Sequence, residues 1–187
     1  QPTADVTIDI SSSDTSEGTV SPDSLTFTSL NWSTPQTVTV TGVDDAFEDG
    51  NVSYTIITAA ASSAGSDYSG YIVNDVSVAN SDDDSAGITV TPVSGLITTE
   101  DGVTDTFDVV LNTQPTADVT IDITSSNEAE GTVSVSLLTF TSGNWNTPQT
   151  VTVTGVDDGA EDGNISYTIV LDNVQSSDSN YSGIAVS

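Results

Sequence analysis

The chain is built from short segments in which apolar and polar residues alternate with a period of two. In 104–112, TDTFDVVLN, every second residue from Phe107 is apolar, and 117–123, ADVTIDI, alternates in the same way. Successive side chains of a strand point to opposite faces, so this period is typical of strands with one face buried. No segment repeats its apolar residues at helical spacing. The pattern therefore predicts an all-β protein.

One full cycle of the pattern contains seven predicted strands, separated by Gly, Asn, Asp and Pro, which are typical of turns. The strands cover residues 86–91, 104–112, 117–123, 137–141, 149–156, 164–171 and 74–80. The residues predicted to face inward are Phe107, Val109, Leu111, Val119, Ile121, Ile123, Val151, Val153, Ile165, Tyr167, Ile169 and Leu171. Seven antiparallel strands of this length fit an Ig-like β-sandwich of about 100 residues.

The cycle is itself repeated along the chain. QPTADVTIDI occurs at 1–10 and 114–123, and the match continues at an offset of 113, with 50 of 74 aligned positions identical. Such self-similarity indicates a tandem array. We expect two Ig-like antiparallel β-sandwiches, with 1–84 lacking the first two strands and 85–187 lacking the last. A window on a longer array is the simplest interpretation, and strands donated by a neighbouring chain are the alternative.

The repeat also predicts which residues share a structural role. Positions related by the offset of 113 should have the same surroundings in their respective repeats. We expect equivalent core positions for the pairs Phe27/Phe140, Tyr54/Tyr167 and Val38/Val151.

Charge narrows the functions that such a protein can have. The 187 residues include 28 acids and no Lys, Arg or His, which gives a net charge of −28. Nothing can neutralise phosphate, so nucleic acid is excluded and an anionic membrane surface is disfavoured. No apolar run is long enough to insert into a membrane. Only solvent cations can offset the charge, so we expect an extracellular or cell-surface protein in a cation-rich medium.

The acids gather in particular loops. If the seven strands alternate in direction, the loops TTEDG (98–102), SSDTSEG (12–18), VDDAFEDGN (43–51) and NSDDDSAG (80–87) belong to one pole of a repeat. Each close carboxylate pair there repels by about 1 kcal/mol in water and about 3 kcal/mol at an effective dielectric of 20. Oxygen ligands in an irregular arrangement suit Ca²⁺, whereas the lack of His and Cys makes zinc and copper poor candidates. The spacing is not that of an EF-hand.

The segments VDDAFEDGNVSYTI, TEDG and DDDSAG resemble the Calx-β domain, a calcium-binding sandwich of exchangers and of tandem arrays in bacterial surface adhesins. The resemblance covers the whole repeat and implies calcium ligands at matching positions. In 1–84 these are Glu17, Asp44, Asp45, Glu48, Asp82, Asp83 and Asp84. In 85–187 they are Glu100, Glu130, Asp157, Asp158 and Glu161. The match at Glu17 and Glu130 departs from the family, since its usual Asp-Tyr is missing there. Local spacing alone adds Asp49 and Asp162.

These observations favour a structural role over a catalytic one. Without His, Cys or Lys the common nucleophile–base pairs cannot form, so we expect no enzyme. We expect a repeat of a long adhesin stalk or surface filament, stiffened by Ca²⁺ and in contact with adjacent repeats. The alternatives are a fibre subunit completed by neighbouring strands, or a glycan-binding module in which exposed aromatic residues stack on sugars. The aromatic candidates for that module are Trp32, Trp145, Tyr68 and Tyr181.

Overall fold

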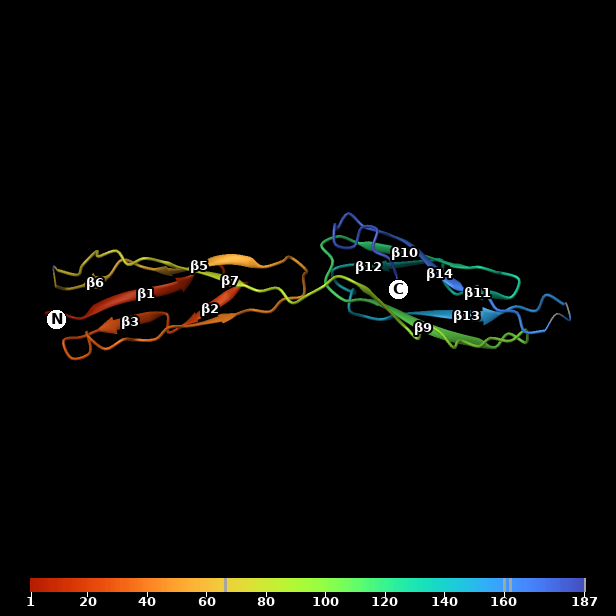
Figure 1. Cartoon of the computed structure of the whole chain (residues 1–187), viewed down its shortest axis with the longest axis horizontal. Helices are drawn as coiled ribbons and strands as arrows, with labels where there is room; N and C mark the ends of the chain where they lie inside the picture. Colours follow the sequence, from red (N-terminus) through yellow and green to blue (C-terminus); the bar gives the residue numbers. More distant parts are fainter. Residues whose placement is uncertain (66, 160, 162, 187) are drawn as a thin grey trace. The chain divides into compact units, whose positions relative to one another are not determined.

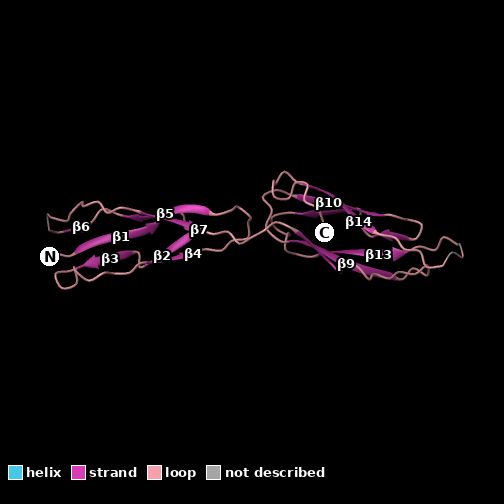
Figure 2. Ribbon diagram, viewed as in Figure 1, coloured by secondary structure: helices cyan, strands magenta, loops and turns pink. Residues whose placement is uncertain are grey.

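The computed structural model describes residues 1–65, 67–159, 161 and 163–186. Throughout this part of the chain there are strands and loops and no helix (Figure 2), which confirms the predicted all-β fold. No helix suited to crossing a bilayer occurs in these residues. The chain divides into two compact units, which are described one at a time. Unit 1 comprises Gln1–Asp45 and Asp49–Asp83, and unit 2 comprises Ala46–Glu48 and Asp84–Ser187.

Unit 1 contains a larger and a smaller antiparallel sheet. In the larger sheet the order is β3-β1-β5-β7, with β6 also paired to β1, and the smaller sheet pairs β2 with β4. The strands are β1 (Val6–Ser12), β2 (Gly18–Ser21), β3 (Ser24–Phe27), β4 (Thr39–Gly42), β5 (Val52–Thr58), β6 (Ser62–Ser63) and β7 (Val76–Asn80). The core between them is small: Ile10, Tyr54 and Ile56 are buried, with partly buried neighbours around them.

Unit 2 has a more complete pair of sheets, of order β12-β10-β14 and β11-β13-β9-β8. Figure 1 shows β10, β12 and β14 on one side of the unit, with β9 and β13 on the other. The strands are β8 (Ile88–Thr91), β9 (Thr104–Leu111), β10 (Val119–Ser125), β11 (Gly131–Val133), β12 (Leu137–Phe140), β13 (Gln149–Gly155) and β14 (Ile169–Gln175).

One hydrophobic core lies between the two sheets of unit 2. Val119, Ile121 and Ile123 of β10 alternate with exposed or half-buried residues and are at most 1% exposed. The facing sheet contributes Phe107, Val109, Leu111, Val151 and Val153, all buried in the same cluster. Residues two apart in a strand share one face, so the predicted inward positions of these strands are confirmed. Two antiparallel sheets that share one core form a β-sandwich.

The sixth predicted strand, residues 164–171, differs from the structure in its bounds. In unit 2 the strand begins at Ile169, and Ile165 is 41% exposed instead of facing the core. In unit 1 the equivalent β5 begins earlier, at Val52, because Val52–Ile56 pairs with β7. Unit 2 lacks a described strand at this position, so the stretch before Ile169 has no ladder to join. The short strands β2, β6 and β11 were not among the predicted ones.

Candidate metal centre

The candidate metal centre of unit 1 lies where β2 begins and where the 43–51 loop follows β4. Antiparallel pairing of β2 and β4 sets Gly18 opposite Gly42, so Glu17 and Val43 extend from the same end of the ladder. The backbone N–H of Val43 donates to the Glu17 carbonyl at 3.0 Å. Glu17 is therefore fixed at the entrance of the loop that carries most of the acids.

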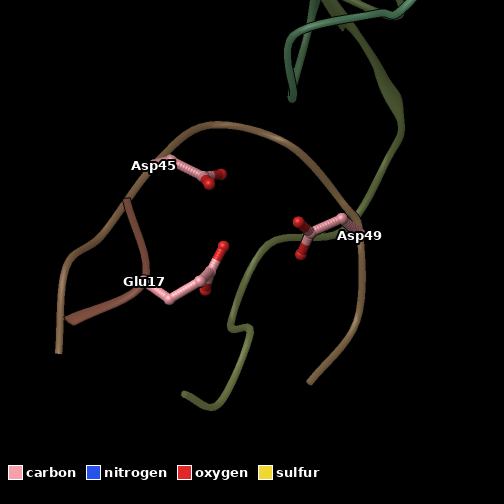
Figure 3. A group of neighbouring side chains, drawn as sticks. All are labelled: Glu17, Asp45 and Asp49. Atoms are coloured by element: carbon pink, nitrogen blue, oxygen red, sulfur yellow. The ribbon is translucent and has the colours of Figure 1, made fainter. Parts of the chain in front are cut away.

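Three carboxylates converge at this point. One carboxylate oxygen from each of Glu17, Asp45 and Asp49 lies within 4.8 Å of the other two. Figure 3 shows Asp45 and Asp49 on an arch of the loop, with the three carboxylates directed into the space that the arch encloses. Glu17 is only 8% exposed, whereas Asp45 and Asp49 are exposed. Glu17, Asp45 and Asp49 thus form a concave group, the carboxylate cup, in which one acid is buried and two face the solvent.

An amide on β7 completes the contacts of the buried acid. The Asn80 side-chain Nδ2 donates to Glu17 Oε2 at 3.3 Å and to the Val43 carbonyl at 2.7 Å. Asn80 reaches this position because it pairs with Val52, the first residue of β5 after the loop. Sequence reasoning did not select Asn80. The available signal was its place at the end of a predicted strand, directly before the run SDDD.

Asp82 fastens the far end of the loop. Its Oδ2 accepts a hydrogen bond from the Gly50 N–H at 2.7 Å, and its own N–H donates to the Asn51 side-chain oxygen at 3.1 Å. Gly50 has a φ of 77°, a left-handed conformation that glycine adopts without steric cost. Of the predicted terminal triplet, Asp82 therefore contacts the backbone of the acidic loop.

The electrostatics of the cup are unfavourable for the protein alone. With no Lys, Arg or His in the sequence, no basic side chain can neutralise its three carboxylates. A carboxylate pair at this separation repels by about 1 kcal/mol in water and more where burial lowers the effective dielectric, as at Glu17. The donors are all hard oxygen ligands, and three clustered carboxylates with nearby backbone carbonyls fit the preferences of Ca²⁺.

The remaining predicted ligands of 1–84 lie in varied surroundings. Asp44 and Asp83 are exposed residues of unit 1, while Glu48 and Asp84 belong to unit 2. Within unit 2 the Glu48 Oε2 accepts a hydrogen bond from the Ala86 N–H at 2.7 Å, and the Glu48 carbonyl accepts one from Asn180 Nδ2 at 2.5 Å. Glu48 is thus engaged with backbone and amide groups of unit 2 and is not in the three-carboxylate group.

The second repeat contains the same local framework. Val156 N–H donates to the Glu130 carbonyl at 3.0 Å, as Val43 does to Glu17, and Asp157 Oδ1 accepts from Gly159 N–H at 2.9 Å. Glu100, Asp158 and Glu161 are exposed. The positions equivalent to Glu17, Asp45 and Asp49 are Glu130, Asp158 and Asp162, and the last of these lies outside the described residues. Whether the second repeat forms the same cup stays a prediction.

The aromatic candidates separate into exposed and covered residues. Trp32 and Tyr68 of unit 1 are 48% and 39% exposed. Their equivalents in unit 2 are covered, because Trp145 packs against the core and Tyr181 is 1% exposed. Tyr181 hydroxyl bonds to the backbone of Thr113, in the loop after β9, and the Leu111 N–H of β9 donates to the Trp145 carbonyl. Unit 1 has no counterpart of β9 among its described strands, which accounts for the exposure of Trp32 and Tyr68.

Comparison with known proteins adds little beyond the fold. No family model matches the chain, and no curated protein matches it. One similar solved structure is described as the S-layer protein rSbsC(31-844), with 18% sequence identity and a TM-score of 0.33. The match covers 96% of this chain and 24% of that one, so the chain spans about a quarter of that structure's length. A similarity at this level carries no argument about function.

Proposed function

We propose that the chain is a non-catalytic structural segment of an extracellular adhesin stalk or surface filament, and that Ca²⁺ bound at its acidic loops stiffens it. The observation that carries the proposal is the convergence of Glu17, Asp45 and Asp49 within 4.8 Å in a sequence without a single basic side chain. The Calx-β resemblance of the same loops points in the same direction. A divalent cation would supply the positive charge that this group otherwise lacks.

Glu17, Asp45 and Asp49 would hold the ion. Glu17 belongs to the segment before β2, whereas Asp45 and Asp49 belong to the loop between β4 and β5. Asn80, the last residue of β7, already hydrogen-bonds Glu17, and Asp82, two residues later, hydrogen-bonds Gly50. Ligands from separate segments would therefore be fixed together. Since only Asp83 separates Asp82 from Asp84, where unit 2 resumes, fixing Asp82 would restrict the connection between successive repeats.

A calcium titration followed by calorimetry tests the metal centre. We expect Ca²⁺ to raise the melting temperature of unit 1, by the equivalent of about 2.7 kcal/mol at a hundredfold excess over the dissociation constant. The variant Asp45→Asn, Asp49→Asn should bind Ca²⁺ far more weakly and lose this rise. In chelator it should also lack the repulsion among these carboxylates that the parent has.

The matched control is Asp9→Asn, Asp23→Asn. It makes the same change in net charge within unit 1, at exposed acids outside the group, and should keep the response to Ca²⁺. Equal responses of the two double variants would show that any effect of Ca²⁺ is general charge screening. Small-angle scattering of a longer array, with Ca²⁺ and with chelator, tests stiffness separately. An unchanged maximum dimension would contradict the structural role of the ion.

The glycan-binding alternative rests on the exposure of Trp32 and Tyr68, which is 48% and 39%. A binding module repeated in tandem should present its aromatic platform in each copy, yet Trp145 packs against the core of unit 2. Because the exposure of Trp32 follows from the missing neighbour of β4, the structural role is favoured. Binding of soluble glycans that is abolished by Trp32→Ala would reverse this preference.

A further inference from the structure

Asn80 joins the carboxylate cup to the last strand of unit 1. It is the final residue of β7, which belongs to the larger sheet of the unit. Its partners Glu17 and Val43 extend from the end of the smaller sheet, next to the paired residues Gly18 and Gly42. One side-chain amide therefore connects the two sheets at the place where the acids gather.

The surroundings of this amide determine which way it faces. Both of its hydrogen-bond partners are acceptors, since Nδ2 lies 3.3 Å from Glu17 Oε2 and 2.7 Å from the Val43 carbonyl oxygen. Each of the two Nδ2 protons thus has an acceptor, which the flipped amide could not provide. Oδ1 faces the backbone of Gly42, where an added Cβ would lie 2.5 Å from it. Asn80 therefore presents a hydrogen-bond donor to the cup and directs its oxygen elsewhere.

A donor at Glu17 favours cation binding in two ways. It holds the carboxylate of a residue that is only 8% exposed in one orientation, so less side-chain freedom is lost when an ion binds. It also places a partial positive charge beside Glu17, which offsets part of the repulsion from Asp45 and Asp49. The contact uses one of the four lone pairs of the carboxylate and leaves the others for an ion.

The same contact links the cup to the pairing of β7 with β5. Asn80 is held beside Glu17 by its pairing with Val52, at one end of the ladder between these strands. Two residues later, the Asp82 carboxylate accepts from the Gly50 N–H at 2.7 Å, next to Asp49 of the cup. Detachment of this end of β7 would remove the donor from Glu17 and free the loop that carries Asp49.

We propose that Asn80 is the positioning residue of the carboxylate cup, and that it couples occupancy of the cup by a divalent cation to the pairing of β7. The inference rests on the proposed function in one respect, namely that the cup binds Ca²⁺. When the end of β7 detaches, the cup loses affinity for the ion. By linkage, a bound ion makes this detachment less favourable by the same factor.

Calcium affinity, measured by calorimetry, tests the positioning role. Asn80→Asp keeps the shape of the side chain but replaces the donor with a carboxylate oxygen. We expect its Kd for Ca²⁺ to be at least about tenfold higher than that of the matched control Asn74→Asp, which adds the same charge at an exposed residue before β7. A Kd equal to or lower than that of the control would overturn the proposal, and a lower one would make residue 80 a direct ligand.

A second variant leaves every acid and Asn80 itself in place. The Cβ of Gly42→Ala would displace the Asn80 amide, because it overlaps Oδ1. We expect this variant also to bind Ca²⁺ more weakly than the parent, by about fivefold or more. An unchanged Kd would show that the position of the amide does not matter to the cup.

Amide hydrogen exchange of the unaltered chain tests the coupling without a substitution that could disturb folding. Exchange in 76–82 is compared with Ca²⁺ and with chelator, and 24–27 in β3 is the reference segment of the same unit. We expect Ca²⁺ to slow exchange in 76–82 at least about tenfold more than in the reference, because this segment must leave Glu17 before it exchanges. Gly42→Ala should lose this excess. Equal slowing of the two segments would overturn the coupling.

Failure of this inference is distinguishable from failure of the proposed function. A parent chain that binds no Ca²⁺ would refute both. A parent whose Ca²⁺ binding is lost in Asp45→Asn, Asp49→Asn, but is unchanged in Asn80→Asp and in Gly42→Ala, would keep its metal centre and refute the role of Asn80 alone.

Discussion

Unit 1 and unit 2 have nearly the same residues over 74 aligned positions, yet they bury different ones. Phe140 and Val151 are fully buried in unit 2, while their equivalents Phe27 and Val38 are only half-buried in unit 1. The cause is β9, whose Phe107, Val109 and Leu111 form part of the core around Phe140. Unit 1 has no equivalent described strand, so β4 is at the edge of a two-stranded sheet and is exposed along its whole length.

The difference is reversed at the other end of the sandwich. Tyr54 is buried in unit 1, where it pairs with Val78 of β7, and Tyr167 is half-buried in unit 2, which has no such strand among its described residues. The two units therefore place equivalent residues beside different neighbouring strands. This difference shows that the role of a residue in a sandwich is decided by the strand that lies beside it, even when its own sequence neighbours are unchanged.

The largest expected effect is in the core. Phe140→Ala should destabilise unit 2 by about 3–5 kcal/mol, since it removes a fully buried ring and leaves a cavity. Phe27→Ala should cost unit 1 about 1–2 kcal/mol, because its ring is already partly in water. Denaturant unfolding followed by tryptophan fluorescence measures both. A Trp32→Phe background reports unit 2 through Trp145, and Trp145→Phe reports unit 1 through Trp32. Equal losses would show that the two positions are energetically the same.

A smaller effect, in which unit 1 rather than unit 2 loses more stability, is expected at a glycine. A Cβ at Gly18 would overlap the Tyr54 hydroxyl and ring, and a Cβ at Gly131 would overlap those of Tyr167. Tyr54 is 5% exposed, whereas Tyr167 is half-buried and its hydroxyl is bonded to the Thr98 hydroxyl, so the Tyr167 ring meets fewer neighbours when it shifts towards solvent. Gly18→Ala should therefore cost about 2–3 kcal/mol and Gly131→Ala about 1 kcal/mol, as for an overpacked core. The same fluorescence backgrounds measure them, and a larger loss at Gly131 would contradict the comparison.

The next effect concerns a buried hydroxyl. Tyr181 Oη donates to the Thr113 carbonyl at 2.8 Å and accepts from the Thr113 N–H at 3.0 Å, in the interior of unit 2. Tyr181→Phe leaves these backbone groups without a partner and should cost about 1–2 kcal/mol. Tyr68→Phe, at the equivalent but 39% exposed position, should cost close to nothing. A measurable loss in Tyr68→Phe would mean that its hydroxyl has a structural role of its own.

The sequence predicts those parts of the fold that local patterns determine. Alternation identified β9 and β10 with their inward faces, because period-two hydrophobicity has one structural meaning. It predicted one strand for 164–171, which the structure begins only at Ile169, because strand pairing depends on a neighbour elsewhere in the chain. Burial of Phe27 and Tyr167 was likewise overestimated. No local pattern reports whether a partner strand is in place.

The candidate metal centre divides in the same way. Local spacing drew attention to the acids of the 43–51 loop, and it alone indicated Asp49. The structure then groups Asp49 with Asp45 and Glu17 and assigns Glu48 to unit 2. The grouping depends on the ladder between β2 and β4, and the contact of Asn80 with Glu17 on the register between β5 and β7. Such convergence is a property of the fold, and composition could only indicate an excess of negative charge.

The smallest expected effect is at Asp178, which has glycine as its counterpart in unit 1, at position 65. Asp178 is 6% exposed, and its carboxylate accepts hydrogen bonds from the Thr116 N–H at 2.7 Å and the Asn180 N–H at 2.9 Å. Burial is the largest single influence and by itself raises the pKa of Asp178, but these hydrogen bonds together hold the pKa below its ordinary value. The ionised form is therefore the one that ties the 176–183 loop to Thr116.

The sign of the pH dependence follows from that direction. Because the folded pKa is lowered, the stabilisation by Asp178 is fully present above the unfolded value of about 3.9 and is lost as the pH falls through the folded pKa. Asp178→Asn should cost unit 2 about 1 kcal/mol at pH 7, and the loss should shrink towards pH 3. The measurement is the difference in unfolding free energy between variant and parent across this range, in the Trp32→Phe background. Asp118→Asn, an exposed acid of the same unit, controls for the change in net charge. A difference that stays constant from pH 7 to pH 3 would show that the charge of Asp178 has no part in holding the loop. The contribution of Asp178 would then come from the packing of its side chain, which the glycine at position 65 of unit 1 does not have.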